Sequence, residues 1–386
     1  MKYIPYGRQS IDERDIKEVV SVLRSDFVTQ GPKVKEFEDT LASFCGAKYV
    51  VALSSGTAAL HLACLAAGIE NGDEVITSPL TFAASANCVL YCQGVPKFTD
   101  IDPLTLNIDP DLLENAITKK TKAIIPVDFA GLPCDYQRIS EIASKKNLTV
   151  IQDAAHSLGA EYKIGKQWFK VGNGQHSDMT IFSFHPVKLI TTGEGGAVAT
   201  NNKKLYERLL ALRAHGIYKD KKTAAKGLWY YEMRDLGFNY RLTDVQSALG
   251  ISQLKKAELF VKERRELAQT YSQYLSAVEN IVLPPEPSGK KSAWHIYPVR
   301  IKKSVNPLGK RKAVFDSLRK EGIGVQVHYI PVYFHPFYQK MGYKMGLCPR
   351  AEDYYKRAFS LPLYPGLAPS EVKSIVRKLI AILKYA

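Results

Sequence analysis

From about residue 45 to residue 200, short apolar runs alternate with segments in which apolar residues recur at helical spacing. The runs typical of strands are Tyr49–Leu53, Glu74–Thr77, Val95–Thr99, Ala123–Val127, Leu148–Gln152, Met179–Phe182 and Ala197–Thr200. Between them, Thr57–Ala67 and Tyr136–Lys146 place apolar residues on one helix face. This alternation predicts a parallel sheet with crossover helices, and therefore an α/β fold.

The pattern changes after about residue 243. A long helical stretch is predicted over about 243–275, with Thr243 or Asp244 as its N-cap. The later predicted elements are a strand over Trp294–Ile301, a helix over Arg311–Lys320, a Gly- and Val-rich strand that leads to His328, and a helix over Val372–Leu383. We therefore predict a large domain over residues 1–250 and a smaller C-terminal α+β domain over residues 251–386.

The composition is that of an ordinary globular protein, with 46% apolar and 24% charged residues among 386. The first residues, MKYIPYGRQS, lack the apolar stretch of a signal peptide, and the longest apolar runs are too short to span a bilayer. We expect a soluble cytoplasmic protein with no membrane partner. The six cysteines have no metal-ligand spacing, so we predict no metal site and interpret them as reduced core residues.

The net charge of +15 is compatible with nucleic acid, an anionic membrane or a phosphorylated small molecule as a partner. Part of the surplus lies in the segment Lys219–Lys226, which is either a solvated loop or a phosphate-binding segment. The basic residues are not interleaved with aromatic ones as in single-strand binders. We therefore predict no nucleic-acid partner, and a phosphorylated small molecule remains the expected partner.

The most informative segment is SFHPVK, residues 183–188, which follows a predicted strand and leads into TTGEGG. Lys188 then lies in a loop rich in hydroxyl groups and glycines, where its amine could meet a bound aldehyde. Ser183 offers a hydroxyl to a phosphate. The alternative is a surface lysine in a turn.

Asp153 ends another apolar strand, TVIQD, about 35 residues earlier. Ligands of parallel sheets gather at the carboxyl ends of the strands, and a partly buried carboxylate there needs a cationic partner. A protonated pyridine nitrogen would supply that partner. The alternative is a helix N-cap.

Two earlier segments add a phosphate site and an aromatic surface. In SSGTAAL, Gly56 and Thr57 follow a strand and begin a helix, where backbone N–H groups can bind a phosphate. Phe82 follows a further strand and could lie against a heteroaromatic ring, although an isolated Phe is more often a core residue. Together with Asp153 and Lys188, these residues match the needs of pyridoxal 5′-phosphate (PLP), which has an aldehyde, a ring nitrogen, a phosphate and a flat ring.

The motifs SSGTAALH, SPLTFAAS, DAAHSLGA, FSFHPVKLITTGEGG and GFNYRLTDVQSALG resemble, in this order, those of the DegT/StrS-type sugar aminotransferases. The resemblance covers essentially the whole chain. It implies a fold-type I PLP-dependent transferase, whose large domain has a mostly parallel mixed sheet flanked by helices. The segments YGRQSIDERDI, WYYE, VQVHYIPVY and SLPLYPGL further resemble the transaminases of pseudaminic acid biosynthesis. That similarity implies a UDP-linked 4-keto-6-deoxy-N-acetyl hexose as acceptor, L-glutamate as donor and UDP-4-amino-4,6-dideoxy-N-acetyl-β-L-altrosamine as product.

The same resemblance implies roles for individual residues. Lys188 matches the lysine that binds the aldehyde and acts in catalysis, and Asp153 matches the partner of the ring nitrogen. The other cofactor positions are Gly56, Thr57 and Ser183 at the phosphate, Phe82 on the ring, His156 near O3′, and Asn239 at the phosphate of the neighbouring subunit's cofactor. Asn239 therefore implies a homodimer with shared active sites, unless it is a simple turn residue. The substrate-binding candidates are Thr29, Gln30, His328 and Tyr329.

Three alternatives remain at this point. The acceptor could be another nucleotide-linked 4-keto-6-deoxy sugar, of the perosamine or bacillosamine type. The chain could be a non-catalytic regulatory binding protein with a PLP-enzyme fold, which the intact set of Lys188, Asp153, Ser183 and Asn239 disfavours. A nucleic-acid-binding protein is suggested by net charge alone.

Overall fold

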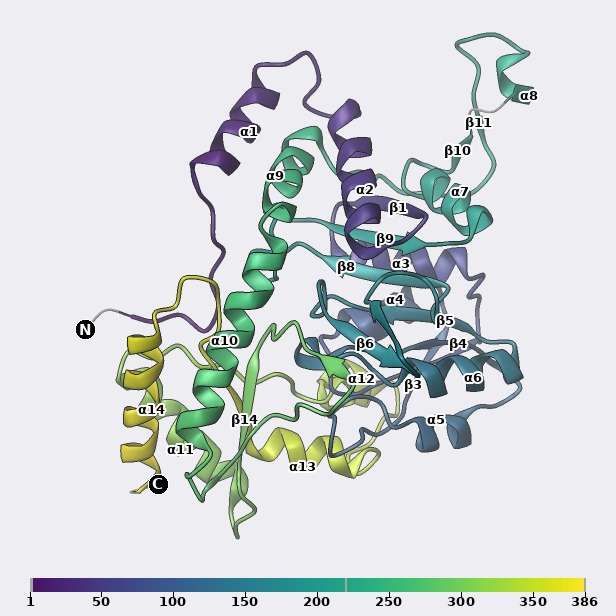
Figure 1. Cartoon of the computed structure of the whole chain (residues 1–386). Helices are drawn as coiled ribbons and strands as arrows, with labels where there is room; N and C mark the ends of the chain where they lie inside the picture. Colours follow the sequence, from purple (N-terminus) through teal and green to yellow (C-terminus); the bar gives the residue numbers. More distant parts are fainter. Residues whose placement is uncertain (1–2, 219–220, 385–386) are drawn as a thin grey trace.

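The computed structural model describes residues 3–218 and 221–384, and its largest element is a seven-stranded sheet (Figure 1). In spatial order the strands are β1 (Tyr49–Leu53), β9 (Gly196–Thr200), β8 (Met179–Ser183), β5 (Thr149–Asp153), β4 (Thr121–Ile125), β2 (Glu74–Thr77) and β3 (Val95–Phe98). The strands from β8 to β3 are parallel, whereas β9 is antiparallel to both of its neighbours. The α/β prediction with a mostly parallel mixed sheet is confirmed.

Helices cover both faces of this sheet. Those around it are α2 (Pro32–Cys45), α3 (Gly56–Ala66), α4 (Ala84–Tyr91), α5 (Pro110–Ala116), α6 (Tyr136–Lys146), α7 (Lys203–Leu212) and α9 (Asp244–Leu254). Because successive strand residues point to opposite faces, Val50 packs in one buried cluster with Phe37 of α2, and Val51 packs in another with Leu62 of α3. Alternate residues of the same strands thus hold the two helix layers.

The C-terminal part has its own sheet and core. Strands β12 (Ile281–Val282), β14 (Tyr297–Ile301) and β15 (Ala358–Leu361) form an antiparallel sheet. The helices after residue 256 are α10 (Ala257–Leu275), α11 (Pro307–Lys320), α12 (Pro336–Lys340), α13 (Pro349–Arg357) and α14 (Pro369–Leu383). Ile4 packs against this core and pairs with Ile323, so the first described residues run along the C-terminal part. The domain division at residue 250 stays a prediction.

Three sequence predictions about this half were wrong in detail. The long helix over 243–275 is two helices, α9 and α10, and at their junction buried Lys256 forms an ion pair with buried Asp15 of α1 (Glu13–Leu23). The Gly- and Val-rich segment before His328 is not a strand. Its backbone partners come from two separate segments, Ile4 and Ser360, so no continuous ladder forms. The predicted strand over Trp294–Ile301 begins only at Tyr297, because Trp294 has a positive φ of 48°.

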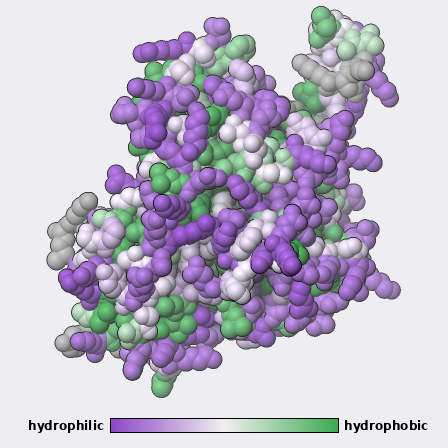
Figure 2. Space-filling model, viewed as in Figure 1, coloured by the Kyte–Doolittle hydropathy of each residue, from purple (hydrophilic) through white to green (hydrophobic). Residues whose placement is uncertain are grey.

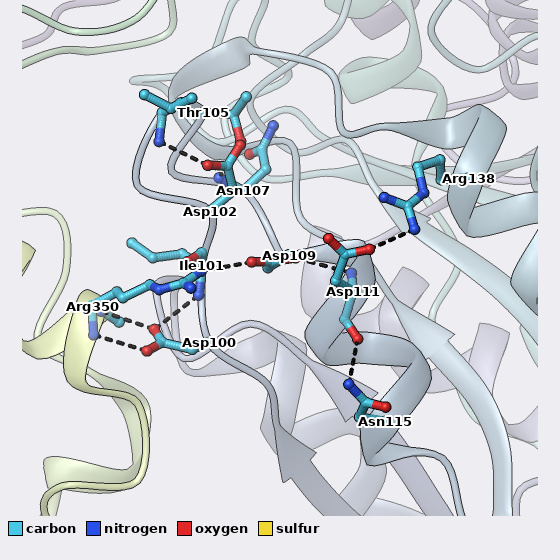
Figure 3. A network of polar contacts seen from close by, with 12 residues as sticks. Asp100, Ile101, Asp102, Thr105, Asn107, Asp109, Asp111, Asn115, Arg138 and Arg350 are labelled. Carbon is cyan, nitrogen blue, oxygen red and sulfur yellow. Dashed lines mark hydrogen bonds and ion pairs between the residues drawn. The ribbon is translucent and has the colours of Figure 1, made fainter.

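A network of carboxylates joins the C-terminal part to the large sheet (Figure 3). Asp100, just after β3, accepts hydrogen bonds from the N–H groups of Arg350 and Ala351 at 2.8 and 2.9 Å. These groups lie in the first turn of α13, which has no side-chain cap of its own. The guanidinium of Arg350 in turn donates to Asp109 at 2.6 Å. A residue 250 positions away therefore caps α13.

Replacing Asp100 with alanine is expected to lower the free energy of unfolding by about 1–3 kcal/mol, because two backbone N–H groups of α13, one of them buried, lose their acceptor. The urea unfolding midpoint measures the change. Asp111→Ala removes a carboxylate of the same network that is 71% exposed and pairs with Arg138. It should cost less than about 0.5 kcal/mol. Equal losses in the two variants would contradict the capping role.

The surface in Figure 2 is largely hydrophilic, and hydrophobic residues appear in several places, among them the projecting hairpin of β10 (Ile217–Tyr218) and β11 (Glu232–Met233). Leu228 and Trp229, between these strands, are 98% and 78% exposed. Lys219 of the basic segment lies outside the described residues, and Lys226 pairs with Glu232 at 3.0 Å.

Across residues 3–218 and 221–384, no helix is long and apolar enough to cross a membrane. All six cysteines are buried and free.

Candidate functional site

A cavity of about 720 Å³ lies where the parallel strands end. Nine of the twelve predicted site residues line it: Gly56, Thr57, Phe82, Asp153, His156, Ser183, Lys188, His328 and Tyr329. Several of these follow the carboxyl ends of neighbouring strands, as expected for a ligand site in a parallel sheet. The structure therefore brings together most of the residues that were predicted separately.

Lys188 lies in the loop between β8 and β9, which is held at both ends. Phe184 donates a backbone hydrogen bond to Gly195 at 2.9 Å, and Thr191 Oγ1 donates to the carbonyl of Phe184 at 3.0 Å. Within the described residues, the Lys188 amine has no hydrogen bond or ion pair. Burial lowers the pKa of Lys188 to about 8, and attraction to Asp153 opposes this shift. A substantial fraction of the amine is therefore neutral, and so nucleophilic, near physiological pH.

Asp153 is the last residue of β5 and is only 4% exposed. Its carboxylate accepts hydrogen bonds from Ser85 Oγ at 2.6 Å and from the N–H of Ala155 at 3.1 Å. No cation within the described part of the chain forms an ion pair with it. Burial raises the pKa of Asp153, while the Ser85 bond, the Ala155 bond and the charge of Lys188 lower it. The Asp153 carboxylate lines a cavity that is large enough to admit a ligand, and a cationic group on that ligand could pair with it.

The helix α3 begins at the cavity wall. Ser55 is its N-cap and accepts a hydrogen bond from Ala58 N–H, which leaves the N–H groups of Gly56 and Thr57 without acceptors in the helix. A Cβ added at Gly56 would lie 2.9 Å from Ser183 Cβ, so the turn can approach the end of β8 only with glycine there. Helix-terminal N–H groups beside a serine hydroxyl form a typical phosphate site.

Aromatic and imidazole groups also line the cavity. The Phe82 ring is 63% exposed and its centroid lies 6.4 Å from that of Tyr329. The Tyr329 hydroxyl lies 3.1 Å from His156 Nε2. Burial lowers the pKa of His156 well below its usual value, so its ring is neutral. His328 Nδ1 lies 2.8 Å from Ser360 Oγ, and burial lowers its pKa to about 3.

Three predicted residues lie outside the cavity. Asn239 is exposed and pairs through its backbone with Ala214. Thr29 and Gln30 are exposed in the loop before α2, where Asp244 accepts a hydrogen bond from the Gly31 N–H at 2.8 Å. The described chain does not bring these three residues to the other nine.

The sequence pattern missed several residues that line the cavity, including Ser85, Tyr6 and His295. The ring of His295 lies 4.2 Å from that of His156, and the ring of Tyr6 lies 5.6 Å from that of His328. Tyr6 reaches the site because its segment follows Gly322–Gly324. Only the YGRQS resemblance pointed to this segment, Ser85 lay in the SPLTFAAS motif without a role assigned to it, and no motif contained His295.

These groups fit PLP chemically. The cavity offers a partly neutral amine, a buried carboxylate without a cation, a helix N-terminus beside a hydroxyl, and an exposed aromatic face. They correspond to the aldehyde, ring nitrogen, phosphate and ring of that cofactor. The described residues contain no group of three His, Cys, Asp or Glu side chains placed to hold a metal ion.

Comparisons with known proteins agree with this chemistry. The UDP-4-amino-4,6-dideoxy-N-acetyl-β-L-altrosamine transaminase of Campylobacter jejuni is 41% identical over 384 residues, covering 99% of this chain and 98% of that protein. The spore coat polysaccharide biosynthesis protein SpsC of Bacillus subtilis is 39% identical over 387 residues, covering 100% and 98%.

Two solved structures superimpose over nearly the whole chain. PseC of Helicobacter pylori, an aminotransferase involved in the biosynthesis of pseudoaminic acid, has a TM-score of 0.92 at 34% identity and covers 100% of both chains. Spr1654 of Streptococcus pneumoniae is assigned as a sugar aminotransferase and has been solved in a PMP-form and a PLP-form. Its PMP-form has a TM-score of 0.92 at 32% identity, and the match covers 99% of this chain and 99% of that chain. A family model matches residues 9–380, and the chain belongs to the DegT/DnrJ/EryC1/StrS aminotransferase family.

Proposed function

We propose that this protein transfers an amino group from L-glutamate to C4 of a UDP-linked 4-keto-6-deoxy-N-acetyl hexose, using PLP held by Lys188. The product is UDP-4-amino-4,6-dideoxy-N-acetyl-β-L-altrosamine, a precursor of pseudaminic acid. The observation that carries the proposal is one cavity that combines a lysine of lowered pKa with a buried carboxylate, in a chain of this aminotransferase family. The similarity to the Campylobacter enzyme supports the choice of sugar.

When bound, PLP supplies an electrophilic carbon and a ring that withdraws electrons from the substrate. Asp153 keeps the ring nitrogen protonated. Once its amine is free of the cofactor and neutral, Lys188 would take the α-proton of glutamate and would later return a proton to the cofactor. In the second half-reaction Lys188 moves protons in the opposite direction, after 2-oxoglutarate has left. We therefore expect ping-pong kinetics.

The remaining cavity residues bind and orient. We propose that Gly56, Thr57 and Ser183 hold the cofactor phosphate, that Phe82 lies against the ring, and that His156 lies near O3′. His328 and Tyr329 would contact the sugar nucleotide. Burial lowers the pKa of His156 and of His328, so both imidazole rings are neutral and would contact their ligands through hydrogen bonds rather than through a positive charge. We also propose a cytoplasmic location, which the free, buried cysteines support.

Product identification tests the function. The purified protein is incubated with glutamate and each candidate UDP-linked 4-keto sugar, and the product is identified by NMR. The altrosamine derivative is expected. A second acceptor, another nucleotide-linked 4-keto-6-deoxy sugar, is favoured by the 39% identity to SpsC, a spore coat polysaccharide protein. Turnover of such a sugar alone would replace the altrosamine assignment and leave the reaction class intact.

We further propose a homodimer in which Asn239, Thr29 and Gln30 complete the partner's cavity. Their exposure away from the cavity of their own chain supports this arrangement. Mixed dimers of Lys188→Ala and Asn239→Ala chains test it. Each variant alone should be nearly inactive, and mixing should restore about a quarter of wild-type activity, because half of the dimers are mixed and each then has one intact site. Absence of recovery from demonstrably mixed dimers would contradict the shared site.

A further inference from the structure

Two hydroxyl groups form a chain that ends on the Asp153 carboxylate. Ser85 Oγ lies 2.6 Å from Asp153 Oδ2, and Thr81 Oγ1 lies 2.7 Å from Ser85 Oγ. The exposures of Thr81, Ser85 and Asp153 are 3%, 1% and 4%. Because all three are buried, water does not compete effectively for these bonds.

The chemistry of the three groups fixes the direction of both bonds. An ionised carboxylate has no proton to give, so Ser85 must donate to Asp153. The proton of Ser85 is thereby committed, so its oxygen accepts from Thr81. The chain therefore runs from Thr81 through Ser85 to Asp153, and the bond from Ser85 is strongest while the carboxylate of Asp153 is charged.

One segment positions both the aromatic residue of the site and this donor. Thr81 and Phe82 lie in the turn after β2, and Ser85 lies in the first turn of α4. The N–H of Ser85 donates to the carbonyl of Phe82 at 3.2 Å. A shift of α4 would therefore move the Phe82 ring and the Asp153 contact together.

We propose that Ser85, supported by Thr81, is a positioning residue that keeps the Asp153 carboxylate ionised and oriented for the protonated ring nitrogen of PLP. This inference rests on the proposed function, since it concerns the same site. Asp153 forms no ion pair within the described chain, so hydrogen bonds contribute most to stabilising its charge before the cofactor binds, ahead of the more distant charge of Lys188. Burial raises the pKa of Asp153, and the Ser85 bond is the largest opposing effect.

Removing the hydroxyl leaves a buried carboxylate that protonates more easily, and a neutral Asp153 no longer holds a proton on the ring nitrogen. A hydrogen bond to a charged group changes an equilibrium roughly tenfold or more. For Ser85→Ala we therefore expect a roughly tenfold fall in kcat and a roughly tenfold rise in the PLP dissociation constant. The KM for glutamate should change less than about twofold, since Ser85 acts through Asp153.

The deciding measurement is the ¹⁵N chemical shift of ring-labelled PLP in the intact holoenzyme, which reports protonation of the ring nitrogen. Wild-type protein should give the protonated value. Ser85→Ala should shift it toward the neutral value, Thr81→Val should shift it less, and Ser85→Thr should restore it. The matched control is Cys88→Ala. Cys88 lies one turn further along α4, is buried, and its thiol contacts the Ser85 carbonyl at 3.4 Å, so the substitution changes packing beside Ser85 and leaves both hydroxyl groups in place. It should lower the melting temperature without moving the ¹⁵N signal.

An unchanged ¹⁵N shift in PLP-loaded Ser85→Ala would overturn the inference and leave the proposed function intact. If Ser85→Ala does not fold, an unchanged shift in Thr81→Val has the same consequence. Wild-type protein that binds no PLP would overturn both proposals. A shift that also occurs in Cys88→Ala would assign the effect to packing of α4 and contradict the hydroxyl chain.

Discussion

Replacing Lys188 with alanine is expected to lower kcat for amino transfer by at least about 10⁴-fold, because one side chain supplies both the nucleophile and the proton carrier. No second amine can take over. Within the described residues, Lys188 is the only lysine that lines the cavity. In that part of the chain its amine has no hydrogen bond or ion pair, and burial lowers its pKa to about 8, so the amine is reactive without a neighbouring base. Coupled release of 2-oxoglutarate and amino sugar provides the measurement.

Lys188→Arg is the matched control, since it keeps a cation in the cavity and removes the nucleophile. Both variants should still bind PLP reversibly, and their visible absorbance should respond to glutamate without turnover. In wild-type protein, borohydride reduction followed by peptide mapping should leave the cofactor on the peptide that contains residue 188. A modified lysine elsewhere, or appreciable turnover by Lys188→Ala, would refute the assignment.

Residues that line the cavity could be predicted from the sequence because each follows a recognisable strand. Asp153 ends β5, Lys188 follows β8, and Gly56 follows β1. In a parallel sheet the strand ends share one edge, so local patterns separated by more than a hundred residues converge without any knowledge of side-chain packing. The ordered motifs then fixed the family.

No role was predicted for Ser85 or His295, because their places in the cavity depend on packing between segments that are distant in the sequence. Ser85 meets Asp153 across 68 positions, and the contact depends on how α4 packs against the sheet. His295 reaches the cavity from the C-terminal part, in a segment whose Trp294 departs from the extended conformation that its apolar pattern predicts. A periodic pattern reports which face is buried, and it carries no signal for contacts between distant segments.

The segment before His328 illustrates a related limit. Its alternating residues predict a strand, but a strand also needs a neighbour with matching free backbone groups. Gly324 instead donates to Ile4, and Gln326 pairs with Ser360. This segment therefore passes from one backbone partner, Ile4, to another, Ser360. The residues that follow it, His328 and Tyr329, then line the cavity.

Asp153→Asn is expected to lower kcat by about 10²- to 10³-fold, the usual cost of removing a preorganised charge from a reacting centre. The amide keeps the size of the side chain and can still accept from Ser85, so the fold should persist. It cannot hold a proton on the ring nitrogen. Steady-state kinetics with saturating glutamate measure the loss, and the ¹⁵N signal of labelled PLP should take the neutral value.

Asp128 offers a control of the same kind, three residues after the end of the neighbouring strand β4. It is fully buried, and burial raises its pKa as it does for Asp153. Four protein donors, namely Cys134 N–H, Tyr136 OH, Gln152 Nε2 and Ser157 Oγ, satisfy its carboxylate. Asp128→Asn should therefore lower stability, since the two donors on the replaced oxygen lose their acceptor, and it should change kcat less than about threefold. Similar kcat losses in both variants would mean that any buried carboxylate here acts through folding. A loss confined to Asp153→Asn would instead assign the effect to the charge that faces the cavity.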